Sequence, residues 1–250
     1  MLRLAIASLA LTVAVASPAA LAAEERPSVA APGSAGASAP DATDVSAPVY
    51  RLPKVGKPRG RIGGGRRGPI TGVAEVRALV PDHVGQTTSA QPSLYWYLAE
   101  PVSADVILEL TVVDETSIDP MLDRRLERPA GAGLQRVRLS DLGVSLEPGQ
   151  EYQWSVAVVP DPEDHSKDVV ASGWVQRVPA SDALMEQLAA AGPEGAASVY
   201  GEAGLWYDML DAAFERIRAN PESEAYRQQL AALLEQAGLP AEAAGSRTLR

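Results

Sequence analysis

Residues 151–159 read Glu-Tyr-Gln-Trp-Ser-Val-Ala-Val-Val, and large apolar side chains occupy every second position from Tyr152 to Val158. The positions between them hold small or polar side chains, namely Gln153, Ser155 and Ala157. Successive side chains of a β-strand point to opposite faces. The alternation therefore predicts a strand with one face in a core and the other face near water.

Turn-forming residues bound this stretch on both sides, at Glu147-Pro148-Gly149 and at Pro160-Asp161-Pro162. Five more short apolar stretches have no helical period between them, and they are residues 73–80, 93–98, 105–114, 135–139 and 169–178. Such spacing predicts an antiparallel β-sandwich over residues 70–179. The turn and strand start at residues 146–154 resemble those of fibronectin type III domains, so a fibronectin III/immunoglobulin-like sandwich is expected. That fold carries no particular function.

A helical period replaces the two-residue period after Pro179. Ser181 is a suitable N-cap for a short helix that reaches Ala191, and a longer helix is expected over residues 195–219. Asn220-Pro221 then interrupts the chain, and a last helix over residues 222–237 ends at Gly238. The two longer helices predict an α-helical hairpin at residues 180–239, docked on the sandwich and followed by a disordered tail at residues 240–250. The expected fold class is α+β.

The first 23 residues have the features of a cleavable signal peptide: Arg3, an apolar run at residues 4–16, and small residues up to Ala23. We expect cleavage after Ala22 or Ala23, which places the mature chain in the periplasm or outside the cell without a transmembrane span. Residues 24–69 are rich in Ala, Pro, Gly and Arg and poor in large apolar side chains, which predicts a disordered leader. The chain has no cysteine, so disulfides and thiolate chemistry are excluded.

Charge is distributed unevenly along the chain. The formal net charge is -10, and it becomes -11 once Arg3 is removed. No acid lies between Asp44 and Glu75, where there are seven basic residues, namely Arg51, Lys54, Lys57, Arg59, Arg61, Arg66 and Arg67. The rest of the mature chain therefore carries -18. An acidic body of this kind repels nucleic acid, which argues against nucleic-acid binding.

Residues 63–68, Gly-Gly-Gly-Arg-Arg-Gly, match the pattern G-x-G-x-x-G. In dinucleotide-binding proteins that pattern ends a strand and opens a helix. Here Lys57-Pro58-Arg59 precedes it without a strand pattern and Pro69 follows it, so we expect no cofactor.

The arginines of this segment are nevertheless a candidate polyanion-binding site, made of Arg59, Arg61, Arg66 and Arg67. Envelope lipid phosphates, an anionic polysaccharide or an acidic protein would suit such a run of positive charge. In the alternative hypothesis, the same arginines lie on the acidic body of their own molecule.

Two loops gather carboxylates: one holds Asp161, Glu163, Asp164 and Asp168 around His165, and the other holds Asp114, Glu115, Asp119 and Asp123. Calcium prefers such oxygens, but neither spacing is that of a known calcium loop, so we predict no metal site and leave calcium binding open. The same acids are the candidates if the protein is a hydrolase or a metal-dependent enzyme. His83, like His165, falls in a predicted loop where histidines are usually solvated, and no residue is assigned a catalytic role.

Aromatic side chains recur at positions that could form a surface platform for a ligand such as a sugar. The candidates are Tyr95, Tyr97, Trp206 and Tyr207. Side chains of this kind are more often core anchors, so both hypotheses are kept.

Several short motifs occur in order along the chain. They are the Gly/Arg-rich residues 59–68, Ala-Leu-Val-Pro at 78–81, Pro-Ser-Leu-Tyr-Trp-Tyr at 92–97, residues 149–154, Gly-Trp-Val-Gln-Arg at 173–177, and Gly-Leu-Trp-Tyr-Asp at 204–208. As an ordered set they resemble the bacterial exported family known only as domain of unknown function 928. The resemblance implies a recurring architecture and names no reaction.

Together these patterns predict an exported, non-enzymatic interaction module of the cell envelope, whose partner is a protein or an envelope polyanion. The first alternative is a hydrolase or metal-dependent enzyme that uses the loop carboxylates. The second is a polyanion-binding protein that acts through the Arg/Gly segment.

Overall fold

The computed structural model describes residues 48–53 and 74–245 of the chain. The expected signal peptide at residues 1–23, most of the expected leader at residues 24–69 and residues 246–250 lie outside these ranges.

Two β-sheets account for the strands of the described residues. The smaller sheet is antiparallel with the order β1-β3-β6, formed by β1 (Val76–Ala78), β3 (Ser93–Leu98) and β6 (Gly133–Arg138). The larger sheet has the order β2-β8-β7-β4-β5, formed by β2 (Gly85–Thr87), β8 (Val169–Arg177), β7 (Glu151–Val159), β4 (Ile107–Asp114) and β5 (Leu122–Leu126). Buried side chains of both sheets belong to one continuous core.

Strand β7 lies at the centre of the larger sheet, where it pairs antiparallel with β4 and with β8. Its even-numbered side chains from Tyr152 to Val158 are buried, and Gln153, Ser155 and Ala157 are only partly buried. The predicted strand and the facing of its side chains are therefore confirmed.

Strand β2 departs from the predicted antiparallel arrangement. It pairs in parallel with β8, with Gly85 opposite Val175 and Thr87 opposite Arg177, so the larger sheet is mixed. Strand β5, at the other edge, was not predicted either, because only Leu122 of its five residues is buried and it shows no alternating pattern.

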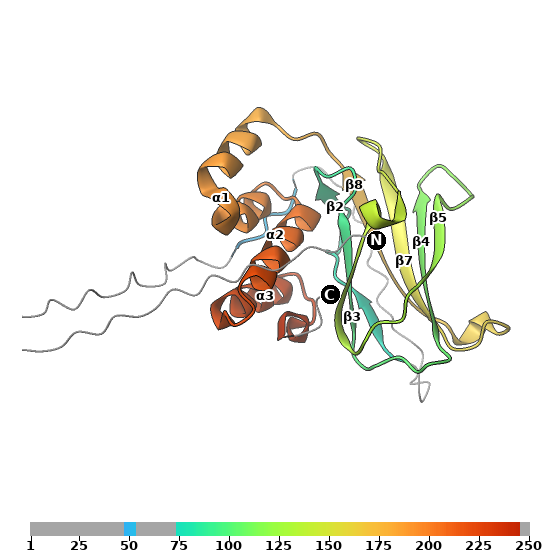
Figure 1. The fold of residues 1–250 in the computed structure, drawn as a ribbon. Coiled ribbons are helices and arrows are strands. Elements are labelled where there is room, and N and C mark those ends of the chain that lie inside the picture. Colours follow the sequence, from blue (N-terminus) through green and yellow to red (C-terminus); the bar gives the residue numbers. More distant parts are fainter. Residues whose placement is uncertain (1–47, 54–73, 246–250) are drawn as a thin grey trace, which may run out of the picture. The chain divides into compact units, whose positions relative to one another are not determined.

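Three α-helices follow the strands, where the sequence predicted a short helix and a hairpin of two longer ones. The predicted N-cap is confirmed, because the Ser181 hydroxyl accepts from the Leu184 N–H at 3.2 Å. Helix α1 (Asp182–Glu202) is kinked at Gly192, whose φ of 61° and ψ of -172° are not helical. The helix expected over residues 195–219 is divided at Gly204, whose positive φ of 76° turns the chain from α1 into α2 (Trp206–Ala219). Helix α3 (Glu224–Gln236) corresponds to the last predicted helix. Figure 1 shows α2 beside β2 and β3, and the three helices lie on the side of these strands away from β4 and β5.

Two segments predicted to be disordered have defined places. Residues 48–53, in the expected leader, contact the helices, and the backbone N–H of Arg51 donates to the carbonyl of Gly201 at 3.0 Å. Near the other end, the short 3-10 helix η3 (Ala241–Gly245) buries Ala243 and Ala244, so the predicted disorder of residues 240–250 is wrong for this part.

Aromatic residues of α2 fasten it to both sheets. The Tyr207 hydroxyl accepts from the Trp154 indole N–H at 2.8 Å and donates to the Trp174 carbonyl at 2.9 Å. The Trp206 indole N–H donates to the carbonyl of Leu79 at 2.9 Å. These bonds satisfy polar groups that burial would otherwise leave without partners. No helix in the described ranges is long and apolar enough to span a bilayer.

Candidate functional site: the strap pocket

Residues 48–53, Pro-Val-Tyr-Arg-Leu-Pro, form a strap across the end of α1, drawn in blue in Figure 1. A Cβ at Gly201 would lie 2.8 Å from the Val49 carbonyl oxygen, and one at Gly204 would lie 3.1 Å from the Arg51 carbonyl oxygen. A Cβ at Gly201 would displace the strap, and the positive φ of 76° at Gly204 disfavours any other residue there, so the two glycines allow the strap to lie close to the helix.

Tyr50 is the aromatic anchor of the strap. Its ring meets the edge of Trp206 at a centroid distance of 4.8 Å and stacks on His83 at 5.8 Å. Its hydroxyl lies 2.8 Å from Nε2 of His83. Burial raises the pKa of Tyr50 and lowers the pKa of His83, so both groups are neutral at neutral pH. A neutral imidazole can accept the Tyr50 proton at Nε2.

A pocket of about 470 Å³ opens beside this pair. Its lining residues are Tyr50, Leu52, Pro81, Asp82, His83, Gln236, Ala237 and Gly238. Leu52 is 73% exposed and offers apolar surface at this place. The pocket is lined by Asp82 and by the carbonyl end of α3, and the last peptide groups of a helix carry partial negative charge. We call this site the strap pocket.

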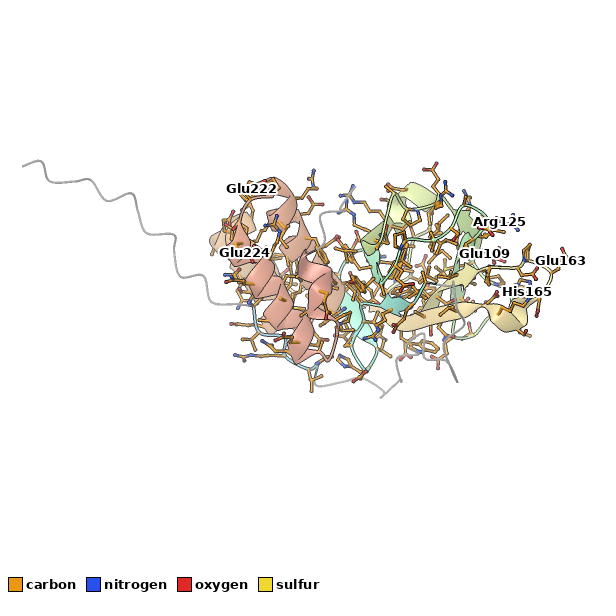
Figure 2. The ribbon with its side chains drawn as sticks, turned by 90° about the horizontal axis from the view of Figure 1, so that it is seen from below. Glu109, Arg125, Glu163, His165, Glu222 and Glu224 are labelled. Carbon is orange, nitrogen blue, oxygen red and sulfur yellow. The ribbon has the colours of Figure 1, made fainter. Side chains whose placement is uncertain are left out.

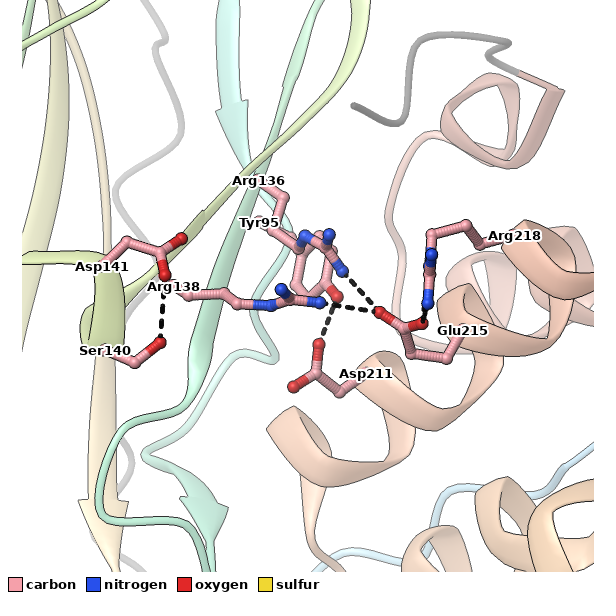
Figure 3. Close-up of polar contacts among 8 residues, drawn as sticks. All are labelled: Tyr95, Arg136, Arg138, Ser140, Asp141, Asp211, Glu215 and Arg218. Carbon is pink, nitrogen blue, oxygen red and sulfur yellow. Dashed lines mark hydrogen bonds and ion pairs between the residues drawn. The ribbon is translucent and has the colours of Figure 1, made fainter. Parts of the chain in front are cut away.

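A second polar cluster lies where β6 meets α2, and Figure 3 shows it in close-up. Glu215 of α2 accepts from Arg136 at 2.8 Å, from Arg138 at 3.0 Å and from Arg218 at 2.6 Å. Beside it, the hydroxyl of Tyr95 donates to Asp211. Burial acts to raise the pKa of Glu215, but hydrogen bonds from Arg218 and Arg136 outweigh it and lower that pKa.

The acidic loop between β7 and β8 lies at the end of the sheet away from the helices, where Figure 2 labels Glu163 and His165. Lys167 contacts Asp161 and Asp164, each at 3.0 Å. His165 Nδ1 lies 2.9 Å from Asp168, and Asp164 also caps the 3-10 helix η2 (His165–Lys167). Asp161, Asp164 and Oδ2 of Asp168 are thus engaged by groups of the same loop, while Oδ1 of Asp168 is buried without a hydrogen-bond partner among the described residues.

The other acidic loop follows β4. Hydrogen bonds from Ser117 and Thr116 lower the pKa of Asp114 to about 2, so this carboxylate acts as the cap of a turn. Glu115, Asp119 and Asp123 are exposed. Over residues 48–53 and 74–245, no three His, Cys, Asp or Glu side chains are grouped so as to hold a metal ion.

The structure places the predicted site residues differently from the sequence expectation. Tyr95, Trp206 and Tyr207 are at most 1% exposed, so the hypothesis of a surface platform is wrong for them and they are core anchors. Tyr97 is only partly buried. The candidate polyanion-binding residues Arg59, Arg61, Arg66 and Arg67 lie outside the described residues.

Sequence reasoning named His83 and Tyr95 but missed the residues that they contact. Nothing local indicates the contact of Tyr50 with His83. Arg136 and Arg138 share one face of a strand, while Glu215 and Arg218 are three apart on a helix. These spacings were visible signals, but the meeting of the strand with the helix was not.

The chain belongs to the family described as Domain of Unknown Function (DUF928), whose model matches residues 62–246. No curated protein matches it. Among solved structures, the chain is similar to Astrotactin-2, described as a conserved vertebrate-specific and perforin-like membrane protein involved in neuronal development. The identity is 16% and the TM-score is 0.26, with 66% of this chain and 28% of that chain covered. A likeness of this size carries no argument about function.

Proposed function

We propose that this protein is an exported, non-enzymatic interaction module of the cell envelope, and that it binds a basic, partly apolar segment of a partner in the strap pocket. The observation that carries the proposal is the pocket itself. It combines the ring of Tyr50 and the exposed side chain of Leu52 with the carboxylate of Asp82.

The charges of the pocket favour a cation. Asp82 lines the pocket beside the end of α3, where the last peptide groups carry partial negative charge. His83 does not oppose a cation because burial keeps its ring neutral. Aromatic and aliphatic surface accommodates the stem of a lysine or arginine side chain while its charged end meets the carboxylate.

A binding role is also favoured because three of the ionisable groups considered as catalytic candidates are engaged in hydrogen bonds or ion pairs within the protein. Nε2 of His83 is engaged by Tyr50, and Asp161 and Asp164 are engaged by Lys167. A general base needs an atom within reach of substrate. The contacts of these groups instead suit a structural or binding role.

We further propose that the two sheets form a β-sandwich of the fibronectin III/immunoglobulin-like kind. Support comes from the alternating burial along β4 and β7 and from the shared core of both sheets. Folds of this kind serve as frames for many unrelated binding sites.

The pocket is tested with two labelled peptides, Gly-Arg-Leu-Arg-Gly and its counterpart with glutamate in place of arginine, by fluorescence anisotropy. We expect the basic peptide to bind and the acidic one not to bind. Asp82→Asn should weaken binding about tenfold, the size expected for one charge-assisted hydrogen bond. Asp105→Asn removes the same charge from an exposed turn and serves as the matched control. Equal binding of both peptides, or an equal loss in both variants, would reject the proposal.

Export is tested separately, by fractionation of the expressing cells and N-terminal sequencing of the purified protein. We expect the mature chain to begin at Ala23 or Glu24. A chain that keeps Met1 and stays in the cytoplasm would contradict the proposed location and leave the pocket test unaffected.

The alternative is a hydrolase or metal-dependent enzyme that uses the loop carboxylates. Its test is a turnover or a calcium affinity that is lost in Asp161→Asn or Asp168→Asn. The Asp82→Asn variant should leave such an activity intact.

A further inference from the structure

Three guanidinium groups converge on one carboxylate where β6 meets α2 (Figure 3). Oε1 of Glu215 accepts from Nη1 of Arg136 at 2.8 Å and from Nη2 of Arg138 at 3.0 Å. Oε2 accepts from Nε and Nη2 of Arg218 at 2.7 and 2.6 Å. A carboxylate has about four lone-pair sites, so Glu215 is saturated.

The arginines have donors to spare. Each guanidinium carries five N–H groups, and the contacts above use one of Arg138 and two of Arg218. The side chains of Arg138 and Arg218 are 43% and 60% exposed, whereas that of Arg136 is only 10% exposed. Three positive charges therefore surround the single charge of Glu215, with two of the three guanidinium groups open to solvent.

A second carboxylate, that of Asp211, lies beside this cluster and accepts from the hydroxyl of Tyr95. Tyr95 is also hydrogen-bonded to Arg136. Figure 2 labels an ordinary pair for comparison, Arg125 and Glu109, in which one guanidinium meets one carboxylate at 3.4 Å. The cluster around Glu215 differs from this pair because three positively charged guanidinium groups contact one carboxylate.

We propose that Arg138 and Arg218, backed by Arg136, form a clamp for a tetrahedral oxoanion such as a phosphate group, and that the Glu215 carboxylate holds the clamp in place while the ligand is absent. Guanidinium groups suit this ligand because their planar forks bind oxoanions through paired, charge-assisted hydrogen bonds. Glu215 is itself 36% exposed and lies on a helix surface, where its side chain can turn aside when the ligand enters. This site is separate from the strap pocket and does not depend on the function proposed for it.

The test measures binding of inorganic phosphate and of inorganic sulfate to the full chain by calorimetry at constant ionic strength. Glu215→Gln should bind both ions about tenfold more tightly than the unchanged protein, because the competing carboxylate is gone. Arg218→Gln should bind them about tenfold more weakly, and Arg138→Gln with Arg218→Gln should abolish binding.

Matched controls are Glu109→Gln and Arg125→Gln, which make the same changes of charge at the ordinary pair. These two variants should leave phosphate binding unchanged. Arg218 is exposed, so its replacement leaves the core intact. If the double variant fails to fold, the phosphate affinity of Arg218→Gln alone still tests the proposal. The proposal is overturned if Glu215→Gln binds phosphate no better than Glu109→Gln does.

Vesicles distinguish the two sources of a phosphate group. If an anionic phospholipid vesicle retains the protein and the double variant is not retained, the ligand is a lipid headgroup. Phosphate binding without vesicle binding assigns the clamp to a free phosphate ion. Either result sustains the clamp, whereas vesicle retention that is equal in the double variant counts against it.

Discussion

His83 and His165, the two histidines of the chain, respond to their surroundings in opposite directions. Burial lowers the pKa of His83, while the hydrogen bond to the Asp168 carboxylate raises the pKa of His165. Both groups start from an ordinary value of about 6.5. The contribution of His83 to stability is full above that value and is lost as the pH falls through its folded pKa. The contribution of His165 is full below that value and is lost as the pH rises through its folded pKa.

Proton NMR can follow both rings, because the spectrum holds only two imidazole signals. We predict one titration below pH 6.5 and one above it. Tyr50→Phe should perturb only the lower one, and Asp168→Asn should bring the upper one back toward the ordinary value. Two rings that titrate together near pH 6.5 would contradict both assignments.

At Gly173 of β8, the neighbouring side chain of Val80 leaves no room for a larger residue. A Cβ there would lie 2.6 Å from the side-chain carbons of Val80. Gly173→Ala should therefore lower the free energy of unfolding by about 1–3 kcal/mol, the usual cost of overpacking. Gly131→Ala is the control, since a Cβ at that position meets nothing within 4 Å. Urea denaturation of both variants checks the difference, and equal midpoints would show that Val80 yields without cost.

At the scale of the residue, the sequence predicts well which side chains share one face of a strand. It predicts poorly whether the opposite face is also buried. The alternation from Tyr152 to Val158 is enough to assign the buried face of β7. It does not say that Tyr95, on the opposite face of β3 from Trp96, is also buried. That face is covered because Phe214 of α2 stacks on Tyr95 at 4.5 Å, and a contact so distant in sequence leaves no local signal.

At the level of the element, the hydroxyl of Tyr207 links helix α2 to two strands of the larger sheet. Tyr207 is buried, and its hydroxyl serves both the Trp154 indole and the Trp174 carbonyl. Tyr207→Phe leaves the indole N–H buried without an acceptor, which costs about 1–3 kcal/mol. We expect a lower urea midpoint with an unchanged slope. Tyr226→Phe, which removes a hydroxyl bonded to exposed Glu194, should change the midpoint little.

The elements that the sequence missed share a physical cause. Strand β2 has only three residues, and its place depends on the parallel partner β8 and on Asp208, which accepts from the Thr88 N–H at 3.0 Å and from the Thr88 hydroxyl at 2.7 Å. The strap is likewise defined by Gly201 and Trp206. Periodicity reports burial within an element, whereas these segments are ordered by distant partners. The long predicted strands and the last predicted helix carry their own periodicity and were found, whereas the helix expected over residues 195–219 is divided at Gly204.

At the scale of the whole molecule, positive charge is concentrated between Asp44 and Glu75, and the rest of the chain is acidic. We predict that changing Arg59, Arg61, Arg66 and Arg67 together to Gln weakens retention on an anionic resin and reduces its salt dependence, if these residues bind a polyanion. Arg124→Gln with Arg125→Gln is a control at the exposed edge of the larger sheet. An unchanged salt profile would favour the alternative hypothesis, in which the arginines lie on their own acidic body.

The parallel pairing of β2 with β8 has a consequence for the order of events during synthesis. Gln86 and Gln176, which lie side by side, are 90 residues apart, and Thr88 and Asp208 are 120 apart. The ribosome releases the first partner of each pair long before the second. Contacts of such separation form late, because a large loop must close before they are made. The β2 edge of the larger sheet therefore forms only after β8 has been made, and the contact of Thr88 with Asp208 only after α2 has been made.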